Sequence, residues 1–203
     1  MAVAYPTSMP STPGVTKSKF GLRTNVDVFE SKFTGTVQTR ERQGARWVGE
    51  YSVAQMTRAQ AAARTAFLTS LNGPAGTFYG FDPDAKTPLG VGTGSPLVKG
   101  ASQTGTTLLT DGWTADQAII MQAGDYFEVA SRLYMVITNA ASDGSGDATL
   151  QISPQLRESP TNNAVITVSN PKVKMRLLTN NESRWDSNEM SLYGINFVGV
   201  ESL

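Results

Sequence analysis

Only one segment of this chain has the periodicity of a helix, and the other apolar segments are short and strand-like. Thr57 and Gln60 form a capping-box pattern, in which each side chain can bond the other residue's free backbone N–H. Apolar residues then recur at steps of three and four until residues 72–74, Asn-Gly-Pro, which stop a helix. The pattern predicts a helix over residues 57–71, whose apolar stripe comprises Met56, Ala59, Ala63, Phe67 and Leu71.

The predicted strands lie on either side of a long Gly/Thr/Pro/Ser-rich stretch at residues 82–105. In residues 46–53, Trp47, Tyr51 and Val53 fall on one face, which is typical of a half-buried antiparallel strand. The polar residues 40–44 end in Gly and predict a turn. We predict strands over residues 26–29, 34–38, 46–53, 77–81, 106–109, 125–129, 133–137, 148–152, 165–168, 174–178 and 192–200.

The last predicted strand has apolar residues on both faces. Tyr193, Ile195 and Phe197 lie on one face, and Leu192, Val198 and Val200 lie on the other. A strand that faces water on one side should alternate with polar residues. We therefore expect both faces to be covered, within one subunit or by a neighbour.

The order of these elements predicts the domain organisation. Five short strands within residues 106–168 fit a small barrel or sandwich, whereas the last two strands need the core around Trp47 and Tyr51. The predicted fold class is mainly β with one α-helix, a discontinuous β-sandwich ring domain with an inserted small β-barrel-like module. Its predicted parts are a flexible N-terminal arm (1–20), the ring domain (21–90 plus 172–203) and the inserted module (91–171).

The Pro-rich arm leaves two alternatives open. It is either a frayed terminus or a segment that orders only against a neighbouring subunit.

The composition of the 203 residues excludes several kinds of chemistry. The chain has no Cys and no His, which removes disulfides, thiolate nucleophiles, the commonest metal ligand and the commonest general base. We predict that the protein is not an enzyme and holds no metal or cofactor. No stretch approaches the roughly 20 apolar residues that span a bilayer, and residues 1–13 lack the pattern of a signal peptide. We expect a cytoplasmic protein, unless it leaves the cell within a larger particle.

Charge gives no sign of a polyanionic partner. Seventeen basic and seventeen acidic residues cancel, and no charged block stands out. We therefore predict no nucleic-acid or membrane partner, although a basic face assembled by folding stays an open alternative.

Two acidic pairs are candidates for catalysis. Asp82 and Asp84 flank Pro83, where turn-forming side chains are common, and Asp125 lies three residues before Glu128. Catalytic carboxylates must face each other across a cleft in environments that split their pKa values, which nearness in sequence does not establish. We predict that both pairs are structural.

Two loops resemble ligand-binding motifs only in part. Asp143 and Asp147 bracket Gly-Ser-Gly as in a calcium loop, but the position that needs Glu is Pro154 and the flanks are strands. Residues 90–94, Gly-Val-Gly-Thr-Gly, resemble a phosphate-binding loop, but no helix begins after them. We predict a solvated hairpin tip and a connector.

Two tryptophans are candidates for carbohydrate stacking. Trp113 and Trp185 both lie in polar surroundings, where an exposed ring can stack on a sugar. The alternative is that each ring packs locally and donates its indole N–H to a nearby group.

Several segments, taken in their order along the chain, resemble the siphophage tail-tip proteins, also called distal tail or minor tail proteins. The resemblance covers most of the chain from about residue 30 onward. It rests on residues 33–39 (Phe-Thr-Gly-Thr-Val-Gln-Thr), Arg46-Trp47, the helix with its Asn-Gly-Pro end, residues 94–105, 109–113, 124–127 and 148–157, Arg184-Trp185 and the closing strand to Glu201.

The resemblance implies a structural virion protein without an active site. Such a protein would form a ring, with six as the number of subunits that the resemblance implies. The ring would join the tail tube to the tip or baseplate, with the tube, the hub and the tape measure as neighbours. The competing classes are a carbohydrate-binding β-protein, a head-completion or capsid-associated protein, and a small carboxylate-based hydrolase.

Overall fold

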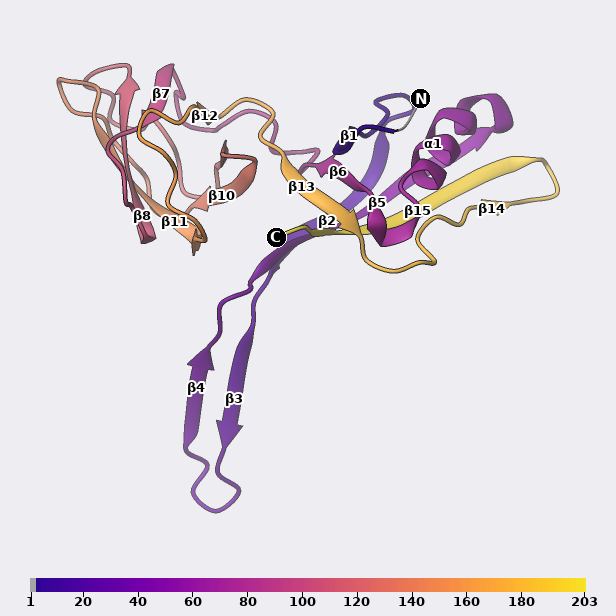
Figure 1. Cartoon of the computed structure of the whole chain (residues 1–203), viewed down its shortest axis with the longest axis horizontal. Helices are drawn as coiled ribbons and strands as arrows, with labels where there is room; N and C mark the ends of the chain where they lie inside the picture. Colours follow the sequence, from indigo (N-terminus) through magenta and orange to yellow (C-terminus); the bar gives the residue numbers. More distant parts are fainter. Residues whose placement is uncertain (1–2) are drawn as a thin grey trace.

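Seven strands form one mixed sheet covered by a helix, and six further strands form a second, barrel-like sheet (Figure 1). The structure is a computed structural model that describes residues 3–203. The predicted fold class, mainly β with one helix and with a barrel-like sheet beside a sandwich-like unit, is confirmed. No helix within residues 3–203 has the length and apolar character needed to cross a bilayer.

The seven-stranded sheet and its helix are called the sheet unit. The strand order is β1-β6-β13-β15-β5-β2, with β14 paired to β15, and all pairs are antiparallel except β1 with β6. The strands are β1 (Thr7–Ser8), β2 (Val15–Arg23), β5 (Arg46–Thr57), β6 (Thr77–Gly80), β13 (Val173–Leu177), β14 (Asp186–Ser187) and β15 (Leu192–Glu201). The sheet therefore combines strands from both ends of the chain.

Helix α1 (Arg58–Ser70) covers the inner face of this sheet. The predicted start is confirmed, because the Gln60 side-chain oxygen accepts the backbone N–H of Thr57 at 3.0 Å. The predicted stop is confirmed too: Asn72 takes a left-handed conformation before the short 3-10 helix η1 (Gly73–Ala75). The Phe67 ring contacts those of Phe78 and Phe197, with centroids 5.7 and 6.5 Å apart.

The predicted apolar stripe of this helix is partly wrong. Phe67 and Leu71 are buried as expected, but Ala59 and Ala63 are exposed. The buried side of the helix is instead rotated toward Ala61, Arg64 and Leu68, since the N-terminal segment covers the Arg64 position.

The prediction of an arm without structure of its own at residues 1–20 is wrong for residues 3–20, and residues 1–2 lie outside the described residues. β2 pairs along most of β5, and β1 pairs with β6. The segment between them is fixed by Arg64, which is 1% exposed and donates hydrogen bonds to the carbonyl oxygens of Pro10 and Pro13. Neither alternative for the arm, fraying or ordering against a neighbour, describes this contact within one chain.

The second sheet, called the barrel module, occupies residues 94–167. Its strand order is β12-β9-β10-β11-β8-β7, and a bridge between Leu97 and Val165 brings its two ends together. The tight β9–β10 turn is formed by Ala130 and Ser131, and both residues have positive φ. The Gly/Thr/Pro/Ser-rich stretch at residues 82–105, where the sequence predicts no strand, contains β7. The strands are β7 (Gly94–Val98), β8 (Gly105–Trp113), β9 (Tyr126–Val129), β10 (Arg132–Val136), β11 (Ala148–Leu156) and β12 (Ile166–Thr167).

A two-stranded hairpin, β3 (Val26–Glu30) with β4 (Val37–Glu41), projects from the sheet unit (Figure 1). The predicted turn at residues 40–44 is right in part: β4 continues to Glu41, and residues 42–45 separate it from β5. The strand predicted over residues 34–38 begins too early, because residues 31–36 form the turn of the β3–β4 hairpin. Ser31 accepts the backbone N–H of Gly35 through its carbonyl oxygen at 2.9 Å, and Gly35 has a φ of 66°. The Gly at the true turn thus supplies the left-handed conformation.

The two faces of the closing strand β15 are both partly covered, within one chain. Ile195 and Phe197 are buried against α1, and on the other face Val200 is buried while Val198 is half-buried. Intramolecular packing therefore accounts for much of the apolar pattern that the sequence shows.

The sheet unit and the barrel module meet at a buried junction around Trp47 and Glu201. The Trp47 indole Nε1 donates to the carbonyl oxygen of Leu133 at 2.8 Å, and its ring packs edge-on against Tyr126. Glu201, 1% exposed, accepts the backbone N–H of Trp47 at 3.1 Å and a hydrogen bond from Arg157 at 2.8 Å. That residues 91–171 form a separate inserted module stays a prediction. If the module folded without the sheet unit, these hydrogen bonds between the two units would be missing.

A second arginine completes the junction. Arg132 donates to the carbonyl oxygen of Ser202 at 3.1 Å, and its guanidinium lies 3.8 Å from the Glu201 carboxylate. Burial raises the pKa of Glu201, while Arg157, the Trp47 N–H and Arg132 oppose that rise. A charged pair buried this well is costly to break from one side, because the remaining partner keeps an uncompensated charge.

We expect Glu201→Gln to lower the free energy of unfolding by about 3 kcal/mol at pH 8, because Arg157 is left without its carboxylate. The double variant Glu201→Met with Arg157→Met should cost less than the single change, since no unpaired charge is left buried. Urea unfolding followed by Trp fluorescence measures both. Equal losses for the single and double variants would contradict the role of the ion pair.

Candidate functional site

Asp125 is committed to backbone hydrogen bonds, which rules it out as a free catalytic carboxylate. Its side chain, 4% exposed, accepts the N–H groups of Leu89 at 2.7 Å, Gly90 at 3.0 Å and Gln122 at 2.7 Å. These bonds fix residues 89–90 of the connector against the barrel module. Asp125 therefore has a structural role, and the predicted phosphate-like loop donates its Gly90 N–H to a carboxylate of the same chain.

The other predicted acidic residues also serve local structure. Glu128 accepts the backbone N–H of Lys172 at 2.9 Å, and burial raises its pKa while that N–H and the Lys172 charge oppose the rise. Asp82 accepts the backbone N–H of Asp84 at 3.1 Å, which is a side-chain turn. The structure does not bring either pair together as two acids facing a cleft.

The acidic loop at residues 143–147 is a turn closed by its own backbone. Asp143 accepts the N–H groups of Ser145 at 2.8 Å and Asp147 at 2.9 Å, and Asp147 pairs with Lys99. The N–H groups of Asp147 and Ser145 hold the pKa of Asp143 below its usual value. Within residues 3–203 no group of three acidic side chains is placed to hold a metal ion.

The two tryptophans have different surroundings. Trp113 is 4% exposed and its indole N–H donates to the Thr110 hydroxyl at 2.8 Å, so its ring is not available for a sugar. Trp185 is 43% exposed, on the segment just before β14. Of the two carbohydrate candidates, only Trp185 keeps an accessible ring.

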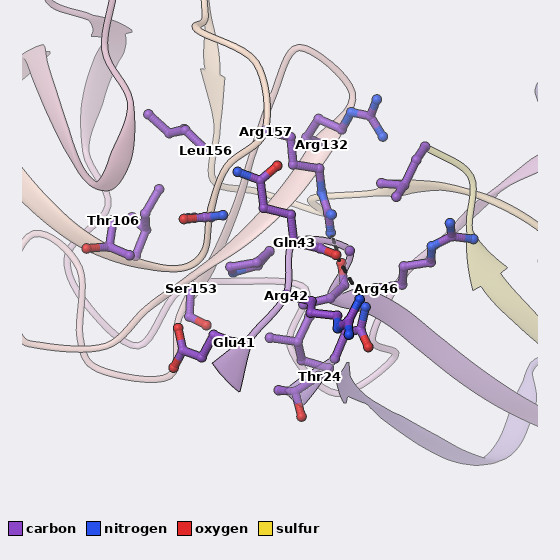
Figure 2. A pocket seen from close by; sticks show the side chains of 18 of the residues that line it. Thr24, Glu41, Arg42, Gln43, Arg46, Thr106, Arg132, Ser153, Leu156 and Arg157 are labelled. Atoms are coloured by element: carbon purple, nitrogen blue, oxygen red, sulfur yellow. Dashed lines mark hydrogen bonds between the residues drawn. The ribbon is translucent and has the colours of Figure 1, made fainter. Parts of the chain in front are cut away.

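A groove of about 730 Å³ lies where the root of the β3–β4 hairpin meets the barrel module and Leu203 (Figure 2). Its size is that of a small-molecule site, and four arginines line it. Three of these have partners already: Arg42 pairs with Asp27, and Arg132 and Arg157 bond groups of the junction. The groove is thus largely a consequence of how the hairpin root and the junction meet, and its remaining cation is Arg46.

The β3–β4 hairpin exposes apolar side chains on both of its faces. Val28, opposite Thr39, and Phe29, opposite Gln38, are each 62% exposed, and Phe33 at the tip is 99% exposed. No other strand of residues 3–203 pairs with this hairpin. A two-stranded hairpin alone in water is marginally stable at best.

A second unpaired element lies at the edge of the sheet unit. β2 pairs with β5 on one side and with no described strand on the other, over nine residues. Such an edge offers free N–H and C=O groups to another chain. The hairpin thus has exposed apolar surface, and this edge has unpaired backbone groups.

The sequence predicts strands in the hairpin region, but it does not predict that the hairpin pairs with no other strand of the described residues. The signal in the sequence was the set of apolar residues Val26, Val28 and Phe29 on the first strand, with Phe33 after it and Val37 on the second. Only the contacts of neighbouring elements show that neither face is covered.

In comparisons with known proteins, no family model matches the sequence, and no curated protein matches it.

We expect Asp125→Asn to lower the free energy of unfolding by about 2 kcal/mol, because hydrogen bonds to a charged acceptor are weakened or lost at three N–H groups. The matched control is Asp84→Asn at an exposed position, which should change stability by less than about 0.5 kcal/mol. Chemical unfolding of both variants gives the comparison. A stability unchanged by Asp125→Asn would contradict the structural role.

Proposed function

We propose that this chain is a structural subunit that assembles with copies of itself, as the ring of a bacteriophage tail tip that joins the tube to the tip or baseplate. The observation that carries the proposal is the β3–β4 hairpin, an isolated ribbon with Val28, Phe29 and Phe33 exposed. Exposed apolar surface rimmed by polar residues marks protein–protein contacts. The proposal requires no catalytic step.

The placement of the hairpin favours a contact between unlike surfaces of two copies. The hairpin leaves the sheet unit between β2 and β5 and extends away from both units, so its tip contacts nothing in its own subunit (Figure 1). A contact between a projecting element and a different surface of the next copy is heterologous, and it generates a ring if the rotation closes. The free β2 edge can add backbone hydrogen bonds to such a contact.

The tail-tip assignment rests on the resemblance of the sequence segments rather than on the ribbon. The resembled proteins form rings, and six subunits is the number that the resemblance implies. In that role the protein would reside in the virion after synthesis in the host cytoplasm. Its partners would be copies of itself and the neighbouring tail proteins.

We expect the purified chain to form a multi-subunit species in light scattering coupled to size-exclusion chromatography, with rings in negative-stain images. Phe29→Ser combined with Phe33→Ser should yield monomers of unchanged circular dichroism, because both rings are exposed in the subunit. The matched control is Leu89→Ser with Val165→Ser, two exposed apolar residues near the barrel module that should leave assembly intact.

Two results would count against the proposal. A wild-type protein that stays monomeric at all concentrations and is absent from purified virions would refute the tail role. A hairpin variant that assembles as well as the wild type would show that the ribbon is not the contact.

A further inference from the structure

The face of the sheet unit that α1 leaves uncovered gathers basic side chains. Residues paired across neighbouring strands point to the same face, so the strand register identifies the set. On this outer face the cations alternate along β2, begin β5, and alternate along β13. We call the following residues the basic face: Lys17, Lys19, Arg23, Arg46, Lys174 and Arg176.

Carboxylates are scarce on the same face. Glu50 is the one acid at an outward position of β2, β5, β6, β13 or β15, and it lies 3.4 Å from Lys19. A further acid, Asp186, is on β14 near the far end of β15. The basic face therefore has a strong local excess of positive charge in a chain whose net charge is zero.

Two of the arginines lie directly opposite each other. Arg23 on β2 is the register partner of Arg46 on β5, and within residues 3–203 neither forms an ion pair. Like charges placed opposite each other destabilise a strand pair. The next charged pair of the same ladder, Lys19 with Glu50, is compensated. An anion bound at Arg23 and Arg46 would relieve their repulsion.

The basic side chains lie in two rows. Lys17 and Lys19 on β2, and Lys174 and Arg176 on β13, are two residues apart, which is roughly 6.6 Å, whereas Arg23 lies four residues beyond Lys19 because Gly21 occupies the position between. The β2 and β13 rows are three strand spacings apart, roughly 14 Å, and Val48, Val198 and Val200 lie between them. Two rows at this separation match phosphates on the two sides of a DNA major groove, which is about 12 Å wide.

We propose that the basic face binds the phosphate backbone of double-stranded DNA without regard to base sequence. An interface for an acidic protein would have aromatic anchors at its centre, whereas here the residues between the two charged rows are valines without an aromatic anchor. Single strands are bound by exposed aromatic platforms, but Tyr79, the aromatic residue on this face, is half-buried with the Lys172 ammonium 5.8 Å from its ring centroid.

The zero net charge does not prevent such binding. At about 0.1 M salt, charges are screened over roughly 10 Å, so a phosphate on this face interacts mainly with the basic face itself. Beside the face, the Glu182 carboxylate already accepts the backbone N–H of Val198 at 2.8 Å. The binding is independent of self-assembly, because the basic face is complete within one subunit.

The test is fluorescence anisotropy of a labelled 24-base-pair duplex of random sequence, titrated with full-length protein at several salt concentrations. We expect binding that weakens steeply with salt. Lys17→Gln with Lys174→Gln should weaken it at least tenfold near 50 mM salt and make the log–log salt slope shallower by about 1.8, because two phosphate contacts are lost. Lys17 is exposed and Lys174 is half-buried without an ion-pair partner among residues 3–203, so circular dichroism should be unchanged.

Reversing charges gives a second comparison. Lys17→Glu with Lys174→Glu should abolish binding, whereas the control Arg58→Glu with Lys99→Glu, which changes net charge equally but lies off this face, should retain it. The proposal is overturned if the wild type does not bind the duplex, or if the control loses as much affinity as the test variant. Tighter binding of polyglutamate or of a single-stranded oligonucleotide than of the duplex would also overturn it.

Discussion

The arrangement of this molecule depends on one requirement: the Glu201 carboxylate, buried in the sheet unit, needs cations that only the barrel module provides. Arg157 and Arg132 supply them, and the same carboxylate accepts the Trp47 N–H, so three separate parts of the chain meet at one acid. A buried charge without such partners would cost several kcal/mol. The junction therefore fixes how the two units sit. The hairpin root begins at the adjacent ends of β2 and β5, so the direction of the ribbon is set there as well.

The elements that could be predicted from the sequence are those whose determinants are local. The Thr57–Gln60 cap, the Asn-Gly-Pro stop and the alternation around Trp47 each act within a few residues, and each predicts its element correctly. The prediction of a flexible N-terminal arm failed because Arg64, which holds this segment in place, is more than fifty residues away. In the sequence, Arg64 looks like a surface residue of the helix. The strand predicted over residues 34–38 began too early, because Gly35 takes the left-handed conformation of the hairpin turn and pairing with β3 begins only at Val37.

The site predictions likewise depend on whether the contacts of a residue are local or distant in the sequence. The structural roles of Asp125 and Asp143 follow from backbone N–H groups that approach them, in one case from the connector more than thirty residues away. The basic face was missed because its residues are not contiguous: they alternate along strands, as in Lys17-Ser18-Lys19 and Lys174-Met175-Arg176. A search for charges at two-residue spacing, rather than for charged runs, would detect each row. Joining the rows requires the strand order, which places β13 and β2 in one sheet.

The position of β15 has a consequence for how the chain reaches this structure. β15 lies between β13 and β5, yet it follows every other strand in the sequence. During synthesis, the barrel module is complete in the nascent chain while β2 and β5 still lack their central neighbour, and the bond from Trp47 to Glu201 closes a separation of 154 residues. Contacts this distant form late and slowly. The sheet unit therefore spends part of its synthesis with the apolar faces of Trp47 and Tyr51 open to chaperones, and translation of the last strand is the step that ends this exposure.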